Sequence, residues 1–162
     1  MGRFIGYEGT LPQPLANESA AAVVEPGTII MDQETGKEYK YVQLDTGTGP
    51  VATALYKLAY YTDSTMLEVT TDIDDAVNLY AVAGVFLAAG QTDTYYIWIQ
   101  ISGPATLTCH DSGLSSGKFV IPYNADGQVD AYAAGKEHAV IGQAMATVDK
   151  TAHTGVVRLF RK

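Results

Sequence analysis

The stretch YYIWIQISG, residues 95–103, is a dense apolar and aromatic run and holds the single tryptophan of the chain. Successive side chains of a β-strand point to opposite faces of a sheet. Tyr95, Ile97 and Ile99 therefore share one face, and Tyr96 and Trp98 share the other. A half-buried strand would carry polar residues on that second face. The run predicts a strand covered on both faces, with Tyr96 and Trp98 as core or subunit-interface candidates. The protein's own core, a sister subunit and a bound ligand are the three covers that fit, and we rank them in that order.

Further strand signals lie on both sides of this run, separated by turn signals about eight to twelve residues apart. They cover residues 28–31, 38–44 and 84–89 before it, and 105–109, 118–132 (a hairpin), 139–148 and 155–161 after it. Gly103-Pro104 interrupts the pattern, which favours a bulge or corner. Asp72 or Asp74 is a suitable first residue for one short helix near residues 74–82. The spacing predicts an all-β fold, a single compact barrel or sandwich with at most that one helix.

The first 25 residues differ from the rest, because glycine and proline punctuate them and forbid a helix. Large apolar side chains nevertheless recur there, at Phe4, Ile5, Tyr7, Leu11 and Leu15. A disordered tail is usually poor in such residues. We therefore expect an extended N-terminal arm over residues 1–25, dispensable for folding, whose five apolar residues contact a partner. A β-rich domain follows over residues 26–162, and an ordinary frayed terminus is the alternative for the arm.

Composition narrows the classes of partner. Only 17% of the residues are charged and Tyr (11) outnumbers Phe (4), which suits partly wet protein interfaces. The net charge is −8, and residues 1–80 hold 4 basic and 12 acidic side chains, which argues against nucleic acid. The apolar run 80–90 is too short to span a bilayer, so we expect no membrane partner. The lone Cys109 indicates folding in a reducing compartment.

Two short motifs suggest hydrolytic chemistry, and neither has the context that such chemistry needs. GLSSG (113–117) matches a nucleophile elbow at Ser115, but an elbow leads into a helix and this one leads into a predicted strand. Asp45-Thr46-Gly47 resembles the motif of aspartic proteases, which need two such aspartates. A homodimer would have to supply the second, so a dimeric protease using Asp45 is the weakest reading. We expect no catalytic residues and no enzyme.

Metal and cofactor motifs are equally weak. Cys109 and His110 are neighbours that would point to opposite faces of a strand, and the three histidines show no zinc spacing. NADGQVD (124–130) carries side-chain oxygens but places its glycine wrongly for an EF-hand. No phosphate-cradling glycine loop is present. We expect no cofactor and no metal, and a calcium site built across several loops stays open.

The order of these segments resembles a known family. Pro26-Gly27 precedes a strand and YKYVQL (39–44), and AGVFLAA (83–89) precedes YYIWIQISGPA (95–105). GKFVIPYNADGQVDAY (117–132), AVIGQAMATV (139–148) and GVVRLF (155–160) follow in that order. The pattern is similar to that of the small decoration (cement, head-stabilising) proteins of tailed bacteriophages. It covers about residues 26–160 and is most specific over 83–103, whereas the N-terminal segment is longer and more acidic than the family pattern requires.

The resemblance implies a β-barrel or β-tulip-like module and a structural role. Such a protein would bind the major capsid protein on the outside of a phage capsid, as a homotrimer at threefold and quasi-threefold positions, and stabilise the head. It would assemble in the host cytoplasm and end on the virion exterior. A β-sandwich binding module for carbohydrate or adhesion, on a virion or cell surface, is the alternative, and exposed aromatic residues on one face would favour it.

Overall fold

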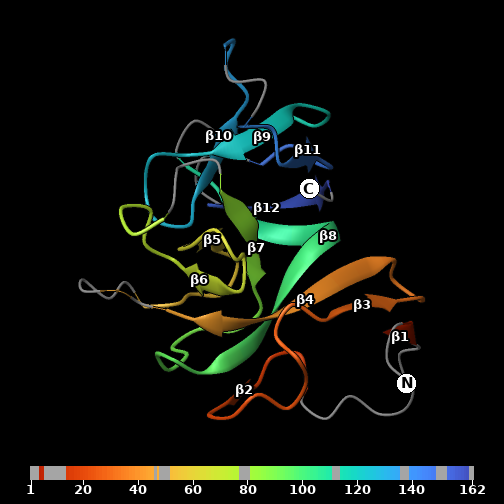
Figure 1. Ribbon diagram of the computed structural model, residues 1–162. Helices are drawn as coiled ribbons and strands as arrows, with labels where there is room; N and C mark the ends of the chain where they lie inside the picture. Colours follow the sequence, from red (N-terminus) through yellow and green to blue (C-terminus); the bar gives the residue numbers. More distant parts are fainter. Residues whose placement is uncertain are drawn as a thin grey trace.

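The computed structural model describes residues 4–5, 14–45, 47, 52–76, 81–110, 114–135, 139–148 and 153–160. Within these residues the chain forms twelve strands and no α-helix, and the fold is all-β (Figure 1). The strands are β1 (Phe4–Ile5), β2 (Glu18–Ser19), β3 (Ile29–Asp32), β4 (Lys37–Leu44), β5 (Leu58–Tyr61), β6 (Glu68–Thr70), β7 (Val82–Phe86), β8 (Tyr96–Thr108), β9 (Phe119–Pro122), β10 (Val129–Ala131), β11 (Gly142–Ala144) and β12 (Thr154–Leu159).

Five strands close into a barrel in the order β4–β6–β5–β7–β8, and β8 returns to pair with β4. The β4–β6 pair is parallel and the other four pairs are antiparallel. Strand β3 extends the sheet beside β4, and β1 pairs with β3. Closure leaves the five barrel strands without a free edge between them, which protects a small sheet from pairing with other chains.

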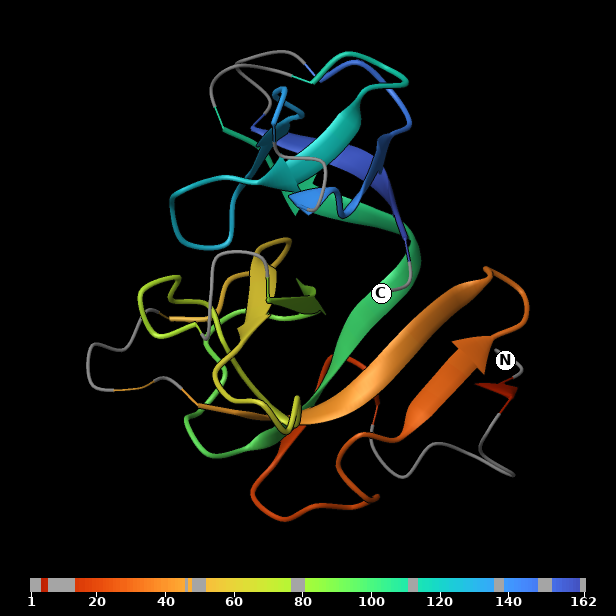
Figure 2. The ribbon, with the colours of Figure 1, turned by 45° about the horizontal axis from the view of Figure 1, so that its top comes forward.

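Strand β8 runs without a break through Gly103-Pro104 and joins the two halves of the molecule (Figure 2). Its first half pairs with β4 in the barrel, and residues 103–108 pair with β12. Gly103 has a φ of 85°, a left-handed conformation that favours glycine. The predicted corner is therefore a bend inside one long strand, which carries the chain into a second sheet ordered β8–β12–β11–β9–β10.

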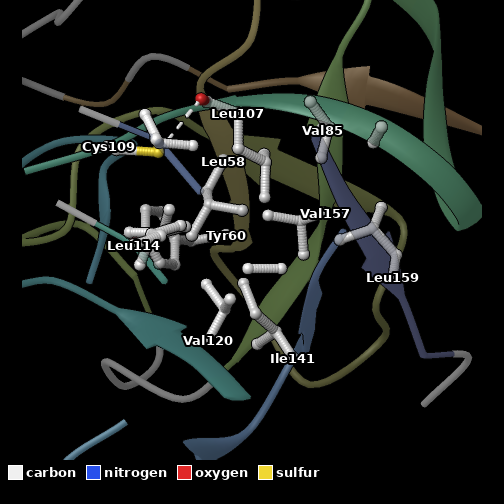
Figure 3. Packing of buried hydrophobic residues seen from close by; sticks show 14 residues of the cluster. Leu58, Tyr60, Val85, Leu107, Cys109, Leu114, Val120, Ile141, Val157 and Leu159 are labelled. Atoms are coloured by element: carbon white, nitrogen blue, oxygen red, sulfur yellow. Dashed lines mark hydrogen bonds between the residues drawn. The ribbon is translucent and has the colours of Figure 1, made fainter. Parts of the chain in front are cut away.

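The interior of the barrel and the space between the two halves hold separate apolar clusters. Val42, Ile97 and Phe86 belong to the cluster on the inner face of the barrel strands. The larger cluster joins residues of β5 and β7, such as Leu58, to Leu107 and Val157 of the second sheet (Figure 3). The larger cluster is therefore shared by the two halves, whereas the smaller one belongs to the barrel alone.

The strands predicted on both sides of the central run are present, with shifted ends. The predicted hairpin over 118–132 is the β9–β10 pair, whose turn is closed by the Gln128 N–H donating to the Ala125 carbonyl at 3.2 Å. The predicted strand over 139–148 is shorter and covers only β11. Residues 73–76 form bends rather than a helix, and residues 77–80 of the predicted short helix lie outside the described part.

Candidate binding surfaces

Trp98 and Tyr41 lie on the outer face of the barrel, opposite the inner cluster. Their side chains are 0% exposed and form a small aromatic cluster with Tyr39 and Ile30. The rings of Tyr41 and Trp98 are 4.9 Å apart at 49°, and Tyr41 stacks on the half-buried Tyr96 at 5.9 Å. Direct cross-strand pairing of Tyr41 with Trp98 places both rings on one face.

The N-terminal segment covers this aromatic cluster. Strand β2 pairs with the start of β8, with Ser19 opposite Tyr96. Leu15 and Val24, on either side of β2, pack against the cluster, and the Val23 N–H donates a hydrogen bond to the Tyr41 hydroxyl at 3.3 Å. The chain's own residues 14–24 are therefore what lies over Trp98.

Burial beneath the N-terminal segment changes the pKa values of the tyrosines in the aromatic cluster. Burial raises the pKa of Tyr39 to about 12, with Asp32 adding to the shift, and burial also raises the pKa of Tyr41. The indole Nε1 of Trp98 is buried and has no hydrogen-bond partner in the structure. Both tyrosines are neutral at physiological pH, so the cluster is an uncharged apolar layer and presents no open aromatic shelf.

The predicted partner-contact residues fall in different places. Phe4 and Ile5 form β1, and they pair with Asp32 and Met31 of β3. Leu15 is half-buried against the aromatic cluster. The other two candidates, Tyr7 and Leu11, lie outside the described residues. The division into an arm of residues 1–25 and a domain of residues 26–162 stays a prediction.

The two hydrolase-like motifs sit in turns. The Asp45 carboxylate accepts a hydrogen bond from the Gly47 N–H at 2.9 Å, which is a local turn contact. Asp45 directly follows β4, at the end of a barrel strand. Ser115 lies in a turn that leads directly into β9, so the helix of a nucleophile elbow does not follow it.

Cys109 and His110 have different neighbours in the structure. Burial raises the pKa of the Cys109 thiol to about 11, and its Sγ–H donates to the Leu107 carbonyl at 3.5 Å. His110 stacks on Tyr123 with ring centroids 3.7 Å apart. Among the described residues no three acidic, cysteine or histidine side chains are arranged to hold a metal ion. The same part of the chain contains no helix of the length and apolarity that crossing a membrane requires.

A surface that the sequence reading missed lies on the outer face of the second sheet. Four exposed apolar side chains gather there, each 39–47% exposed, and we call them the outer-sheet patch: Phe119, Met145, Val156 and Phe160. The burial of β12 alternates strictly, so Val156 points outward with Arg158 while Val157 and Leu159 face the core. Val156 and Val157 are identical neighbours, so the sequence of β12 alone does not show which of the two is exposed.

A second exposed group lies beside the barrel, and we call it the β3 patch: Ile29, Met31 and Met66. Ile29 and Met31 point outward on β3 on either side of the buried Ile30. Ile29 pairs with Lys40, whose Nζ donates to the Met66 carbonyl at 2.7 Å, so Met66 adjoins the strand. The structure therefore presents two separate apolar surfaces, one on each half.

Comparisons with known proteins place the fold. The closed barrel with an attached second sheet defines an all-β module. Among solved structures it is similar to the head fiber gp8.5 N base of bacteriophage phi29, with a TM-score of 0.51 over 76% of this chain and 94% of that chain. The two sequences are 12% identical, so the likeness is one of fold. No family model and no curated protein matches this sequence.

Proposed function

We propose that this chain is a structural protein of a bacteriophage virion that binds the outer surface of the capsid, as a homotrimer, and stabilises the head. The observation that carries the proposal is the fold likeness, which spans 94% of the phi29 head fiber base. The resemblance of residues 26–160 to phage decoration proteins supports it independently, because that resemblance rests on sequence order rather than on coordinates. The major capsid protein is the partner, and the chain performs no catalysis.

Trp98 and Tyr41 do not form a glycan-binding surface, and the exposed aromatic pair that the binding-module alternative could use is Phe119 with Phe160. A carbohydrate shelf needs an open aromatic face, whereas Trp98 and Tyr41 are 0% exposed beneath residues 14–24. A structural protein instead needs apolar surface that other chains cover, and the outer-sheet patch and the β3 patch offer it. Strand β1 pairs with β3, so Phe4 and Ile5 would add to the β3 patch in the attachment region.

Co-sedimentation tests the proposal. Heads of the parent phage prepared without this protein would be mixed with the purified chain, and bound chain would be counted per capsid after centrifugation. We expect binding to saturate at a whole number of chains per equivalent position of the capsid lattice. We also expect the heads with bound chain to be disrupted at a higher temperature. Deletion of residues 1–13 should weaken binding, since it removes four of the predicted contact residues and leaves the cover of Trp98 in place.

Unsaturable or absent binding by a folded trimer would contradict the proposal. Leu55→Asp serves as the control, because Leu55 is an exposed apolar residue in a turn outside both patches and the arm. If glycan arrays captured the chain while heads did not, the binding-module alternative would take its place.

A further inference from the structure

The N-terminal segment that covers Trp98 is a peripheral element of the fold. None of the eleven residues 14–24 is buried and seven of them are exposed, although Trp98 beneath them is 0% exposed. An element that buries little of its own surface opens at a small cost in free energy. Residues 14–24 therefore cover the aromatic cluster without being fixed in place by burial of their own side chains.

The contacts of the N-terminal segment join it to strand edges and to a loop of the barrel. Strand β2 pairs with β8, and β1 pairs with β3. The Glu18 carboxylate accepts hydrogen bonds from the Thr92 N–H and, at 2.8 Å, from the Thr92 hydroxyl, in the loop between β7 and β8. These partners all belong to residues 29–98, so one barrel presents a complete binding site for the segment.

One turn connects the N-terminal segment to the barrel. The Thr28 N–H donates to the Glu25 carbonyl at 3.1 Å, and Gly27 inside this turn has a φ of 91°. Glycine adopts left-handed and right-handed conformations about equally readily, so Gly27 allows the turn to open at little steric cost. Pro26 favours an extended conformation at Glu25, which directs an opened turn away from the barrel.

The chain between β1 and β2 is longer than the positions that it connects require. Leu15 packs against the aromatic cluster that contains Ile30, and Ile5 pairs with Met31, the next residue along β3. Both ends of this stretch thus lie close to the same cluster. The ten residues from Ile5 to Leu15 span up to about 33–36 Å when extended. This length lets β1 follow β2 onto a neighbouring barrel.

A peripheral segment with a complete binding site, one connecting turn and surplus length is an element that copies of a chain can exchange. We infer that residues 1–24 of one copy cross to the next copy, where β2 pairs with that copy's β8 and β1 pairs with its β3. The segment keeps all of its contacts, and only the copy that supplies them changes. This inference rests on the proposed homotrimer, in which neighbouring subunits hold the binding sites at high effective concentration.

An engineered disulfide shows which copy supplies the partner strand. Ser19 and Tyr96 are directly opposite on β2 and β8, and opposite residues have a Cα separation of about 4.5–5.5 Å that suits a disulfide. The full-length variant Ser19→Cys/Tyr96→Cys would be oxidised and run on a denaturing, non-reducing gel. We expect a covalent trimer for most of the protein, because each disulfide then joins two copies. A covalent monomer overturns the inference.

Ile29→Cys/Lys40→Cys is the matched control. These two residues are opposite on β3 and β4, which one short turn joins, so their disulfide lies within one chain and the control should remain a covalent monomer. Cys109 is buried and burial raises the pKa of its thiol to about 11, so it competes little for oxidation. If the Ser19 pair stays reduced, Ile5→Cys/Met31→Cys tests β1 and β3 with the same two outcomes.

Failure of this inference is distinguishable from failure of the proposed function. Sedimentation equilibrium and head binding of the parent chain measure the trimer and the capsid role without any disulfide. A parent trimer that binds heads, while the cysteine pairs give covalent monomers, keeps the proposed function and overturns the exchange. Two pairs that both stay reduced overturn it as well, because neither strand then lies at its binding site. A covalent trimer that does not bind heads supports the exchange and contradicts the capsid role.

Discussion

At the scale of single residues, Trp98 has the largest fully buried side chain and supports both β4 and the N-terminal segment. We expect Trp98→Ala to lower the free energy of unfolding by about 3–5 kcal/mol, the usual result of truncating a buried aromatic residue. Thermal or urea unfolding measures this directly. Trp98→Phe is the control and should lose much less, because it keeps the stacking on Tyr41. Unchanged melting of Trp98→Ala together with lost partner binding would show that Trp98 serves a contact instead.

Tyr39 limits the stability of the folded protein at alkaline pH. Its pKa in the folded state is raised to about 12, above the unfolded value near 10. The stability it contributes is therefore complete below about pH 10 and is lost as the pH rises toward 12. Unfolding measured against pH should show this loss, followed by circular dichroism and tyrosinate absorbance. Tyr39→Phe should flatten the curve in that window, and an equally steep loss in this variant would assign the effect to other groups.

At the scale of elements, strand β8 depends on one residue at its bend. An alanine Cβ at Gly103 would lie 3.0 Å from the Gly36 carbonyl oxygen and 3.2 Å from the Lys37 Cα. Gly117 has a similar φ of 80°, but its added Cβ would meet nothing within 4 Å. Both alanine variants carry the left-handed strain of about 1–2 kcal/mol, and only Gly103→Ala adds a collision with backbone. We expect Gly103→Ala to melt lower than Gly117→Ala, and equal melting temperatures would show that the turn before β4 yields freely.

Much of the strand content follows from local sequence, and much of the pairing does not. Period-two alternation around Trp98, the hairpin turn at Asn124–Gly127 and the corner at Gly103 are all local signals, and each appears in the structure. Barrel closure by β4 and β8 is a contact between distant segments, which alternation alone does not specify. The sequence also does not predict which residues cover Trp98, because β2 is two residues long and gives no periodic signal.

The same limit applies to the candidate surfaces. The local sequence around an aromatic residue at position 96 or 98 is the same whether the barrel interior, the chain's own N-terminal segment or a sister subunit covers that residue. The environment of such a residue is known only once the distant strand that carries Tyr41 has been placed beside it. The outer-sheet patch shows the converse, since Val156 and Val157 are alike in sequence and opposite in exposure.

At the scale of the whole molecule, the N-terminal segment connects folding to attachment. Removing residues 1–24 takes away β2, Leu15 and Val24, and with them the cover of Trp98. We expect this truncation to lower the melting temperature and to shift tryptophan fluorescence to the red. Removing only residues 1–13 should leave the fluorescence unchanged. A truncation at residue 24 that melts like the full chain would show that the arm is dispensable for folding.

The closure of the barrel also determines how long one strand waits for its partner during synthesis. Tyr41 pairs with Trp98, 57 residues later in the chain, so β4 lacks its partner until β8 has been made. At about 5–20 residues per second, that interval on the ribosome lasts roughly 3–11 seconds. Throughout it, the apolar face of β4 and one of its edges stay open to other nascent chains. When many copies are translated at once, each chain is therefore most at risk of aggregation midway through its own translation. Slowing translation initiation should raise the yield of soluble protein more than using a stronger promoter would.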